Sequence, residues 1–216
     1  MNVYLVSGLG ADKRIFSKIG FDKKLNIVHL DWIPFDRKEL MKDYAGRLSR
    51  AIDASKPFAL IGVSFGGMIA VEIAKVLKPS VTIIISSTIL SKHLPFVYKL
   101  VGKLGFLDII PPHVLKASNN LTRNYFFGTK SSEEKKLLKN IIDDSDSHFL
   151  KWAVGSILNW KNDIRPENLF HIHGTSDRIL YSNKAKPDFT IKNGTHFAIY
   201  QNADVISKLI NKLILR

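Results

Sequence analysis

The sequence of 216 residues contains no cysteine. Disulfide bonds, thiolate metal sites and a cysteine nucleophile are therefore excluded. Long hydrophobic runs are missing as well, because the longest apolar run, residues 81–85, is far too short to cross a bilayer. The first residues enter strand-like sequence without the charged and apolar regions of a signal peptide. We therefore expect a cytoplasmic protein that has no membrane partner.

Acidic residues are scarce beside basic ones, with 19 Asp and Glu against 32 Lys and Arg and a net charge of +13. Clustered positive charge would indicate nucleic-acid binding. Residues 90–166, however, hold 12 basic and 7 acidic residues, about their proportional share of the net charge. The charge is therefore spread along the chain. This favours a solvated basic surface, and nucleic-acid binding is the weaker alternative.

Short apolar segments of strand type alternate with segments of helical periodicity, which is typical of an α/β fold. Strands are expected at residues 3–6, 25–30, 58–61, 81–85, 168–173 and 189–191, and helices at residues 40–52, 68–77 and 205–214. The run at residues 81–85 is β-branched throughout, which indicates burial on both faces, as in a parallel sheet.

The alternation stops between residues 90 and 166. Apolar residues there recur at helical intervals, clearest at residues 137–142 and 149–158, and strand patterns are missing. We therefore expect a core of residues 1–89 and 167–216 with a helical cap insertion at residues 90–166. Asp143, Asp144 and Asp146 resemble a cation site, but the neighbouring serines favour helix capping.

The chain is organised around Gly62-Val63-Ser64-Phe65-Gly66, which lies between a strand and a long apolar helix. This pattern fits the nucleophile elbow, G-x-S-x-G, in which a serine sits on a strained turn. A side chain two residues before or after the serine would collide with the neighbouring strand and helix. Ser64 is therefore the predicted nucleophile.

A serine nucleophile needs a base, and the base needs an orienting acid. In open α/β sheets both should lie in loops at the carboxyl ends of strands. Two loops qualify, and they contain Asp177 and His196. In isolation each is more simply a turn or loop residue. Their chain order, Ser64, Asp177, His196, matches the order expected of such a triad and favours the catalytic interpretation.

The tetrahedral intermediate of acyl transfer needs hydrogen-bond donors for its oxyanion. The backbone N–H of Phe65, at the start of the apolar helix, is well placed to be one. The backbone N–H of Leu9, in the glycine-punctuated loop Ser7-Gly8-Leu9-Gly10 after the first strand, is the predicted second donor.

These segments together resemble the α/β-hydrolase superfamily over nearly the whole chain. The matching motifs are Ser7-Gly8-Leu9-Gly10, Gly62 to Gly67, His173-Gly174-Thr175-Ser176-Asp177-Arg178 and Gly194-Thr195-His196-Phe197. The resemblance implies a mostly parallel sheet, a helical cap before the strand that bears the acid, and hydrolysis without a cofactor. The family's usual N-terminal hairpin is missing, so about six strands are expected. Ser7-Gly8 also replaces the His-Gly of many members.

The resulting hypothesis is a serine hydrolase that cleaves a small or medium carboxylic ester or thioester through an acyl-enzyme, with no metal ion or other cofactor. Its partner would be the small-molecule substrate. The sequence does not distinguish ester or thioester hydrolysis from C–C bond cleavage, because the geometry of the cap determines the substrate. The alternative is a ligand-binding or receptor-type protein of the same fold with little turnover. The pattern does not indicate an oligomeric state.

Aromatic residues of the cap and of the histidine loop are candidates for the wall of an acyl pocket. They are Phe96, Trp152, Trp160 and Phe197. Simple packing of the cap on the core explains the two tryptophans and Phe96 equally well. His171 and His173 lie two apart on one strand and so share a face, which permits a metal pair but favours packing near the site.

Overall fold

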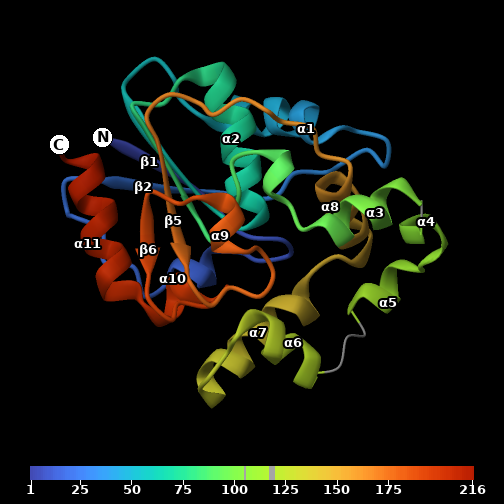
Figure 1. Ribbon diagram of the computed structural model, residues 1–216. Coiled ribbons are helices and arrows are strands. Elements are labelled where there is room, and N and C mark those ends of the chain that lie inside the picture. Colours follow the sequence, from blue (N-terminus) through green and yellow to red (C-terminus); the bar gives the residue numbers. More distant parts are fainter. Residues whose placement is uncertain (105, 117–119) are drawn as a thin grey trace.

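The computed structural model describes residues 1–104, 106–116 and 120–216 (Figure 1). Six strands within these ranges form one sheet in the order β2-β1-β3-β4-β5-β6, and every pairing is parallel. The strands are β1 (Asn2–Val6), β2 (Asn26–Leu30), β3 (Phe58–Val63), β4 (Val81–Ile85), β5 (Leu169–Gly174) and β6 (Phe189–Ile191). The predicted α/β class and parallel sheet of about six strands are confirmed.

Helices cover both faces of the sheet. In Figure 1, α1 and α2 lie on one side of the strands and α11 lies on the other. The helices outside the segment between β4 and β5 are η1 (Lys13–Phe16), α1 (Met41–Leu48), η2 (Ser49–Ala51), α2 (Phe65–Leu77), α9 (Ser182–Ala185), α10 (Ala198–Gln201) and α11 (Ala203–Ile214).

Two hydrophobic cores follow from the alternation of side chains along the strands. On β4, Ile84 packs into the core beneath α1 and α2, whereas Ile83 and Ile85 pack into the core beneath α10 and α11. All three side chains are fully buried. A strand that faces apolar helices on both sides needs a largely apolar run, which β4 supplies apart from the buried Thr82.

The regular elements described between β4 and β5 are all helices, and loops join them. Its elements are η3 (Ser91–His93), α3 (Phe96–Lys103), α4 (Phe106–Ile109), α5 (Pro112–Lys116), α6 (Asn120–Phe127), α7 (Ser132–Asp144) and α8 (Ser147–Leu158). We call residues 90–166 the inserted segment. Figure 1 shows α6 and α7 below the sheet and α3, α4 and α5 beside it.

The three aspartates that resemble a cation site have separate roles. Asp146 is the N-cap of α8, where its side chain accepts a hydrogen bond of 2.7 Å from the backbone N–H of Phe149. Asp143 pairs instead with Lys139, and Asp144 pairs with Arg14 at 2.7 Å. Capping is therefore confirmed for Asp146 alone. No group of metal-ligating side chains is found in the described part of the chain.

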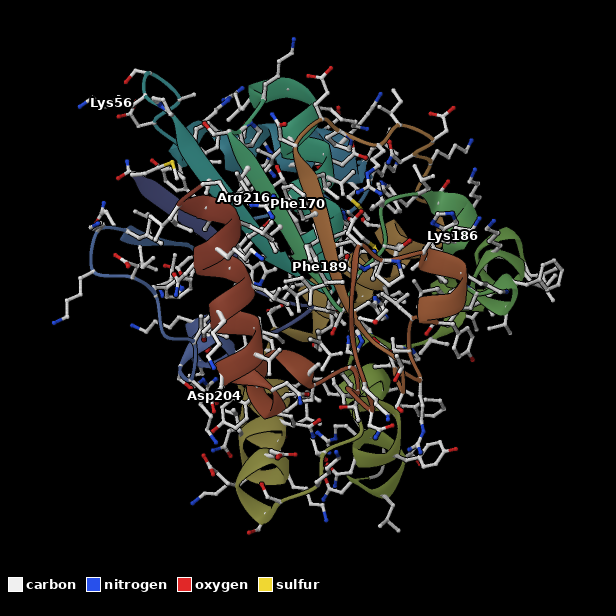
Figure 2. The ribbon with its side chains drawn as sticks, turned by 60° about the vertical axis from the view of Figure 1, so that its left-hand side comes forward. Lys56, Phe170, Lys186, Phe189, Asp204 and Arg216 are labelled. Carbon is white, nitrogen blue, oxygen red and sulfur yellow. The ribbon has the colours of Figure 1, made fainter. Side chains whose placement is uncertain are left out.

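The last helix closes the second core. The inward face of α11 is apolar, and its end reaches the edge of the sheet, where Arg216 lies 6.0 Å from the ring centroid of Phe170. Figure 2 shows this edge, with Phe170 of β5 and Phe189 of β6 as neighbours. Across the described ranges, no helix combines the length and apolarity that a membrane span requires.

Candidate active site

Ser64 sits on a strained turn between β3 and α2. Its backbone has φ 52° and ψ −119°, which a residue other than glycine rarely adopts. Two hydrogen bonds hold this conformation: Ser64 N–H donates to the carbonyl of Ile85 at 2.9 Å, and the hydroxyl of Ser87 donates to the carbonyl of Ser64 at 2.7 Å. The predicted elbow is therefore present, and α2 begins directly after the serine.

The glycines of the elbow have the steric role expected of them. A Cβ on Gly62 would lie 2.3 Å from the carbonyl oxygen of Gly66. A Cβ on Gly66 would lie 2.0 Å from the carbonyl oxygen of Ser7, in the loop after β1. Both positions therefore require glycine, and the elbow packs directly against the Ser7 loop.

The three predicted side chains converge at the carboxyl edge of the sheet. The Oγ of Ser64 lies 2.9 Å from Nε2 of His196, and Nδ1 of His196 lies 2.8 Å from Oδ2 of Asp177. Asp177 and His196 are buried, whereas Ser64 is partly exposed. Because Nδ1–H of His196 donates to the carboxylate, Nε2 is free to accept the serine proton.

Asp177 is held as a carboxylate by three hydrogen bonds and by a second histidine close to one of its oxygens. Its Oδ1 accepts from the backbone N–H groups of Ile179 and Leu180 at 2.8 and 2.9 Å. Its Oδ2 faces His196 at 2.8 Å and also Nε2 of His173 at 3.1 Å. Burial alone would raise the pKa of Asp177, but the charge of His196 and the hydrogen bonds from both histidines outweigh burial and lower it well below its usual range.

The acid loop and the histidine loop meet through two glycines. A Cβ on Gly174, at the end of β5, would lie 2.2 Å from the carbonyl oxygen of Gly194. The same oxygen accepts a hydrogen bond of 2.8 Å from the backbone N–H of Ser176. This backbone contact places Asp177 and His196 within reach of each other although they follow different strands.

The Ser7 loop is fixed by hydrogen bonds onto one carbonyl. The hydroxyl of Ser7 donates to the carbonyl of Ala11 at 2.6 Å, and Nε1 of Trp32 donates to the same oxygen at 3.0 Å. The backbone N–H of Ala11 donates to the carbonyl of Gly8 at 2.9 Å, which closes the turn. Ser7, which stands where many α/β-hydrolases have histidine, therefore stabilises this loop through its hydroxyl group.

The two predicted oxyanion donors belong to the residue that follows Ser64 and to the loop that packs against it. Phe65 is the first residue of α2, so its N–H has no acceptor inside the helix. Gly8 packs against the serine, since a Cβ there would lie 3.5 Å from Cβ of Ser64, and Leu9 follows it. The N–H of Leu9 makes no hydrogen bond to the described residues.

The inserted segment is fastened to this loop. The Oγ of Ser145, between α7 and α8, lies 2.6 Å from the carbonyl oxygen of Gly10. Gly10 itself has φ +63°, and a Cβ there would lie 2.5 Å from that Oγ and 2.7 Å from Leu150. The salt bridge between Asp144 and Arg14 adds a second attachment next to it.

The aromatic residues proposed for the pocket wall occupy different places. Phe96 is 73% exposed at the start of α3, which does not fit a place in a pocket wall. Trp152 and Trp160 are buried against the core, and their indole N–H groups donate to the carbonyl of Glu39 and the carboxylate of Glu72. Phe197 is buried beside Tyr200 in the core under α11.

A cleft of about 930 Å³ lies along α8. Its lining includes Phe35, Lys42, Leu107, Lys151, Trp152 and Trp160. Ser64 and His196 do not border it. Leu150 of α8 lies instead beside Gly10, so the helix separates the cleft from the Ser7 loop.

Phe127 is a neighbour of the site that sequence reasoning missed. Its ring meets the imidazole of His196 edge-on, with centroids 5.4 Å apart and planes at 79°. Its carbonyl accepts a hydrogen bond of 3.2 Å from the backbone N–H of Phe197. Nothing in the sequence marks Phe127, because it ends a short helix of the inserted segment and belongs to no motif.

His171 and His173 contact each other rather than forming part of a larger ligand set. Nε2 of His171 lies 2.9 Å from Nδ1 of His173, and both side chains are buried in the sheet. Burial lowers the pKa of His171 to about 3, so its imidazole is neutral at pH 7. The two histidines are therefore packed in the sheet next to the site, as the sequence pattern favoured.

No family model matches the sequence, and no curated protein matches it either. Solved structures do match over the full chain. The enol-lactonase from Burkholderia xenovorans has a TM-score of 0.74 at 12% identity, covering 100% of this chain and 91% of that chain. An esterase from Exiguobacterium antarcticum has a TM-score of 0.74 at 14% identity, covering 99% and 91%. A thermophilic esterase from Thermogutta terrifontis has a TM-score of 0.67 at 12% identity, covering 99% and 89%.

These likenesses extend over the whole fold, including the six-stranded parallel sheet. At identities of 12–14% they bear on the fold rather than on a shared substrate. The chain has the α/β-hydrolase fold.

Proposed function

We propose that this protein is a serine hydrolase that cleaves a small or medium carboxylic ester or thioester through an acyl-enzyme. The observation that carries the proposal is the unbroken hydrogen-bonded chain from Ser64 Oγ through His196 to Asp177, with distances of 2.9 and 2.8 Å. Geometry of this kind activates a serine hydroxyl at neutral pH. Esterases among the structures of similar fold support the same reaction class.

In the proposed mechanism, Oγ of Ser64 attacks the acyl carbon while Nε2 of His196 takes its proton. The backbone N–H groups of Phe65 and Leu9 stabilise the oxyanion that forms. His196 then gives the proton to the leaving alcohol or thiol, and Asp177 stabilises the imidazolium in between. Water, deprotonated by His196, releases the acid and restores the serine. The steps use only these groups and water.

The test is a comparison of the parent protein with Ser64→Ala. We expect a fluorophosphonate probe to label the parent on the peptide that contains Ser64 and to leave the variant unlabelled. Turnover of p-nitrophenyl acetate and butyrate should fall by at least about 10³-fold in the variant. Ser80→Ala, at an exposed serine far along the chain from the elbow, is the matched control.

Equal turnover by Ser64→Ala and the parent would contradict the proposal. A single burst of p-nitrophenol without further turnover would indicate the ligand-binding alternative instead. A panel of oxygen esters and acyl-CoA thioesters of increasing chain length, run on the parent, then identifies the acyl group and the bond that is cleaved.

A further inference from the structure

Asp177 has a second histidine partner that the proposed mechanism does not use. His173 lies near the end of β5, and its Nε2 is 3.1 Å from Oδ2 of Asp177. This is the same oxygen that faces Nδ1 of His196 at 2.8 Å. The side chains of His173 and Asp177 are both fully buried, so water does not compete for the contact.

The neighbours of His173 fix which of its nitrogens carries hydrogen. Nε2 lies 2.8 Å from the carbonyl oxygen of Leu180, and a carbonyl oxygen only accepts hydrogen bonds. Nε2 therefore bears a hydrogen, which it donates to that carbonyl, while Oδ2 of Asp177 lies 3.1 Å from the same nitrogen. On the other edge of the ring, Nδ1 of His173 accepts the Nε2–H of neutral His171 at 2.9 Å.

We propose that His173 is a positioning residue that acts on His196 through Asp177. With its Nε2–H group 3.1 Å from Oδ2, His173 fixes the position of the carboxylate and stabilises part of the negative charge that this oxygen presents to the imidazolium of His196. The effect of His173 on catalysis rests on the proposed function, whereas its contact with Asp177 is present in the folded protein whatever the reaction.

The direction of the effect follows from the charge on the shared oxygen. A hydrogen bond donated to a carboxylate stabilises the carboxylate and makes it a weaker acceptor for other donors. Without the His173 donor, Asp177 would bind Nδ1–H of His196 more strongly and favour the protonated imidazole. His196 would then lose its proton at higher pH, and the acid limb of the pH–rate profile would move in the same direction.

Other ionisable groups surround this cluster from several elements. Tyr98 of α3 lies near Asp177, and burial raises the pKa of Tyr98 to about 12, so this phenol stays neutral. His93 of η3 faces His171, and burial lowers the pKa of His93. Arg165 also faces His171, but Arg165 is paired with Asp188 at 2.6 Å. Tyr181 lies beside Tyr98.

The experiment compares three variants with the parent. His173→Leu removes the donor, and His173→Gln keeps an N–H donor at nearly the same distance from the backbone. His171→Leu is the comparison variant, because His171 is equally buried on the same strand and does not contact Asp177. It removes the hydrogen bond to Nδ1 of His173, but the carbonyl of Leu180 still keeps the hydrogen of His173 on Nε2. Urea unfolding of each variant first shows that it is folded.

The primary readout is the titration of the His196 imidazole, followed by NMR of the ring C–H and N–H signals. It does not depend on turnover. We expect the midpoint in His173→Leu to move to higher pH by about 0.5–1 unit, and the midpoints in His173→Gln and His171→Leu to stay within about 0.2 unit of the parent. The pH profile of kcat/KM for p-nitrophenyl acetate is the second readout and should shift equally.

The outcomes separate this proposal from the proposed function. A shifted midpoint in a protein without esterase activity would support the role of His173 and contradict the hydrolase assignment. Esterase activity with an unshifted midpoint in folded His173→Leu would overturn the role of His173 and leave the hydrolase assignment intact. A shift of the same size in His171→Leu would also overturn it, because the effect would then arise with the Nε2–H group of His173 still in place beside Asp177.

Discussion

Gly62 and Gly66 approach each other so closely across the serine turn that a Cβ on the first would lie 2.3 Å from the carbonyl oxygen of the second. This contact sets the angle between β3 and α2 and therefore the direction of the Ser64 side chain. Any larger residue at position 62 must push the start of α2 away from the strand.

Gly62→Ala should therefore unfold more easily and lose activity. We expect the free energy of unfolding to fall by about 2–4 kcal/mol, because overpacking of a tight backbone contact adds to displacement of α2. Gly46→Ala is the matched control: Gly46 is an exposed residue of α1, and a Cβ there meets no atom within 4 Å. It should gain about 0.5–1 kcal/mol from higher helix propensity. Urea unfolding measures the stability of both variants, and turnover of p-nitrophenyl acetate measures their activity. Parental stability and activity in Gly62→Ala would contradict the steric argument.

Ser7→Ala tests the loop that presents the N–H of Leu9. The variant loses the hydrogen bond of 2.6 Å to the carbonyl of Ala11, although Trp32 still donates to that oxygen. We expect a modest loss of stability, about 1 kcal/mol, since the carbonyl keeps one partner. We expect kcat for p-nitrophenyl acetate to fall about 10-fold with little change in KM, because a misaligned oxyanion donor acts in the transition state. A rise in KM alone would contradict this role.

Asp177→Asn tests the orienting acid. The amide has nearly the same shape but presents N–H groups, so it no longer stabilises the protonated form of His196. We expect kcat to fall by about 10³–10⁴-fold while the protein stays folded. Asp163→Asn is the control, since Asp163 is exposed in the inserted segment. If Asp177→Asn retained parental kcat, another group would have to orient His196.

Stability should decline with acid in two steps. The folded-state pKa of His171 is about 3, below the ordinary value of 6.5, so between these values the unfolded chain binds a proton that the folded chain does not. Stability is thus present above pH 6.5 and falls by up to about 1.4 kcal/mol per pH unit below it. The pKa of Asp177 is also lowered, so its contribution, present above about pH 4, is lost only as the pH falls further.

The measurement is urea unfolding at pH 7, 6, 5 and 4. The parent should lose stability from pH 6.5 downward, and His171→Gln should show a flatter slope over this first step. His113→Gln, at an exposed histidine of α5, should follow the parent. Parallel slopes for the parent and His171→Gln would mean that His171 does not stay neutral in the folded protein.

Sequence patterns predicted those features that depend on local chemistry or on chain order. The β-branched run at residues 81–85 specified β4, because a strand buried on both faces needs largely apolar residues. Ser64, Asp177 and His196 were found from their loops, because the ends of parallel strands meet at one edge of a sheet. The start of α2 was predicted less well. The helix begins at Phe65, but its apolar pattern is recognisable only from residue 68, because Gly66 and Gly67 carry no side chains that show helical periodicity.

Features that depend on contacts between distant segments were not predictable in this way. The roles of Phe127 and His173 follow from where α6 and β5 lie relative to the histidine loop. The short helices of the inserted segment, such as α4 and α5, have too few turns for a clear period. The exposure of Phe96 likewise depends on how α3 packs rather than on its own sequence.

The attachment of Ser145 to Gly10 has a consequence for how the inserted segment can move. The junction of α7 and α8 cannot swing outward without breaking this contact and the neighbouring ion pair between Asp144 and Arg14. Leu9, which the proposed function makes an oxyanion donor, precedes Gly10 directly in the chain. Under that proposal, we expect any outward movement of the junction to disturb the donor loop as well.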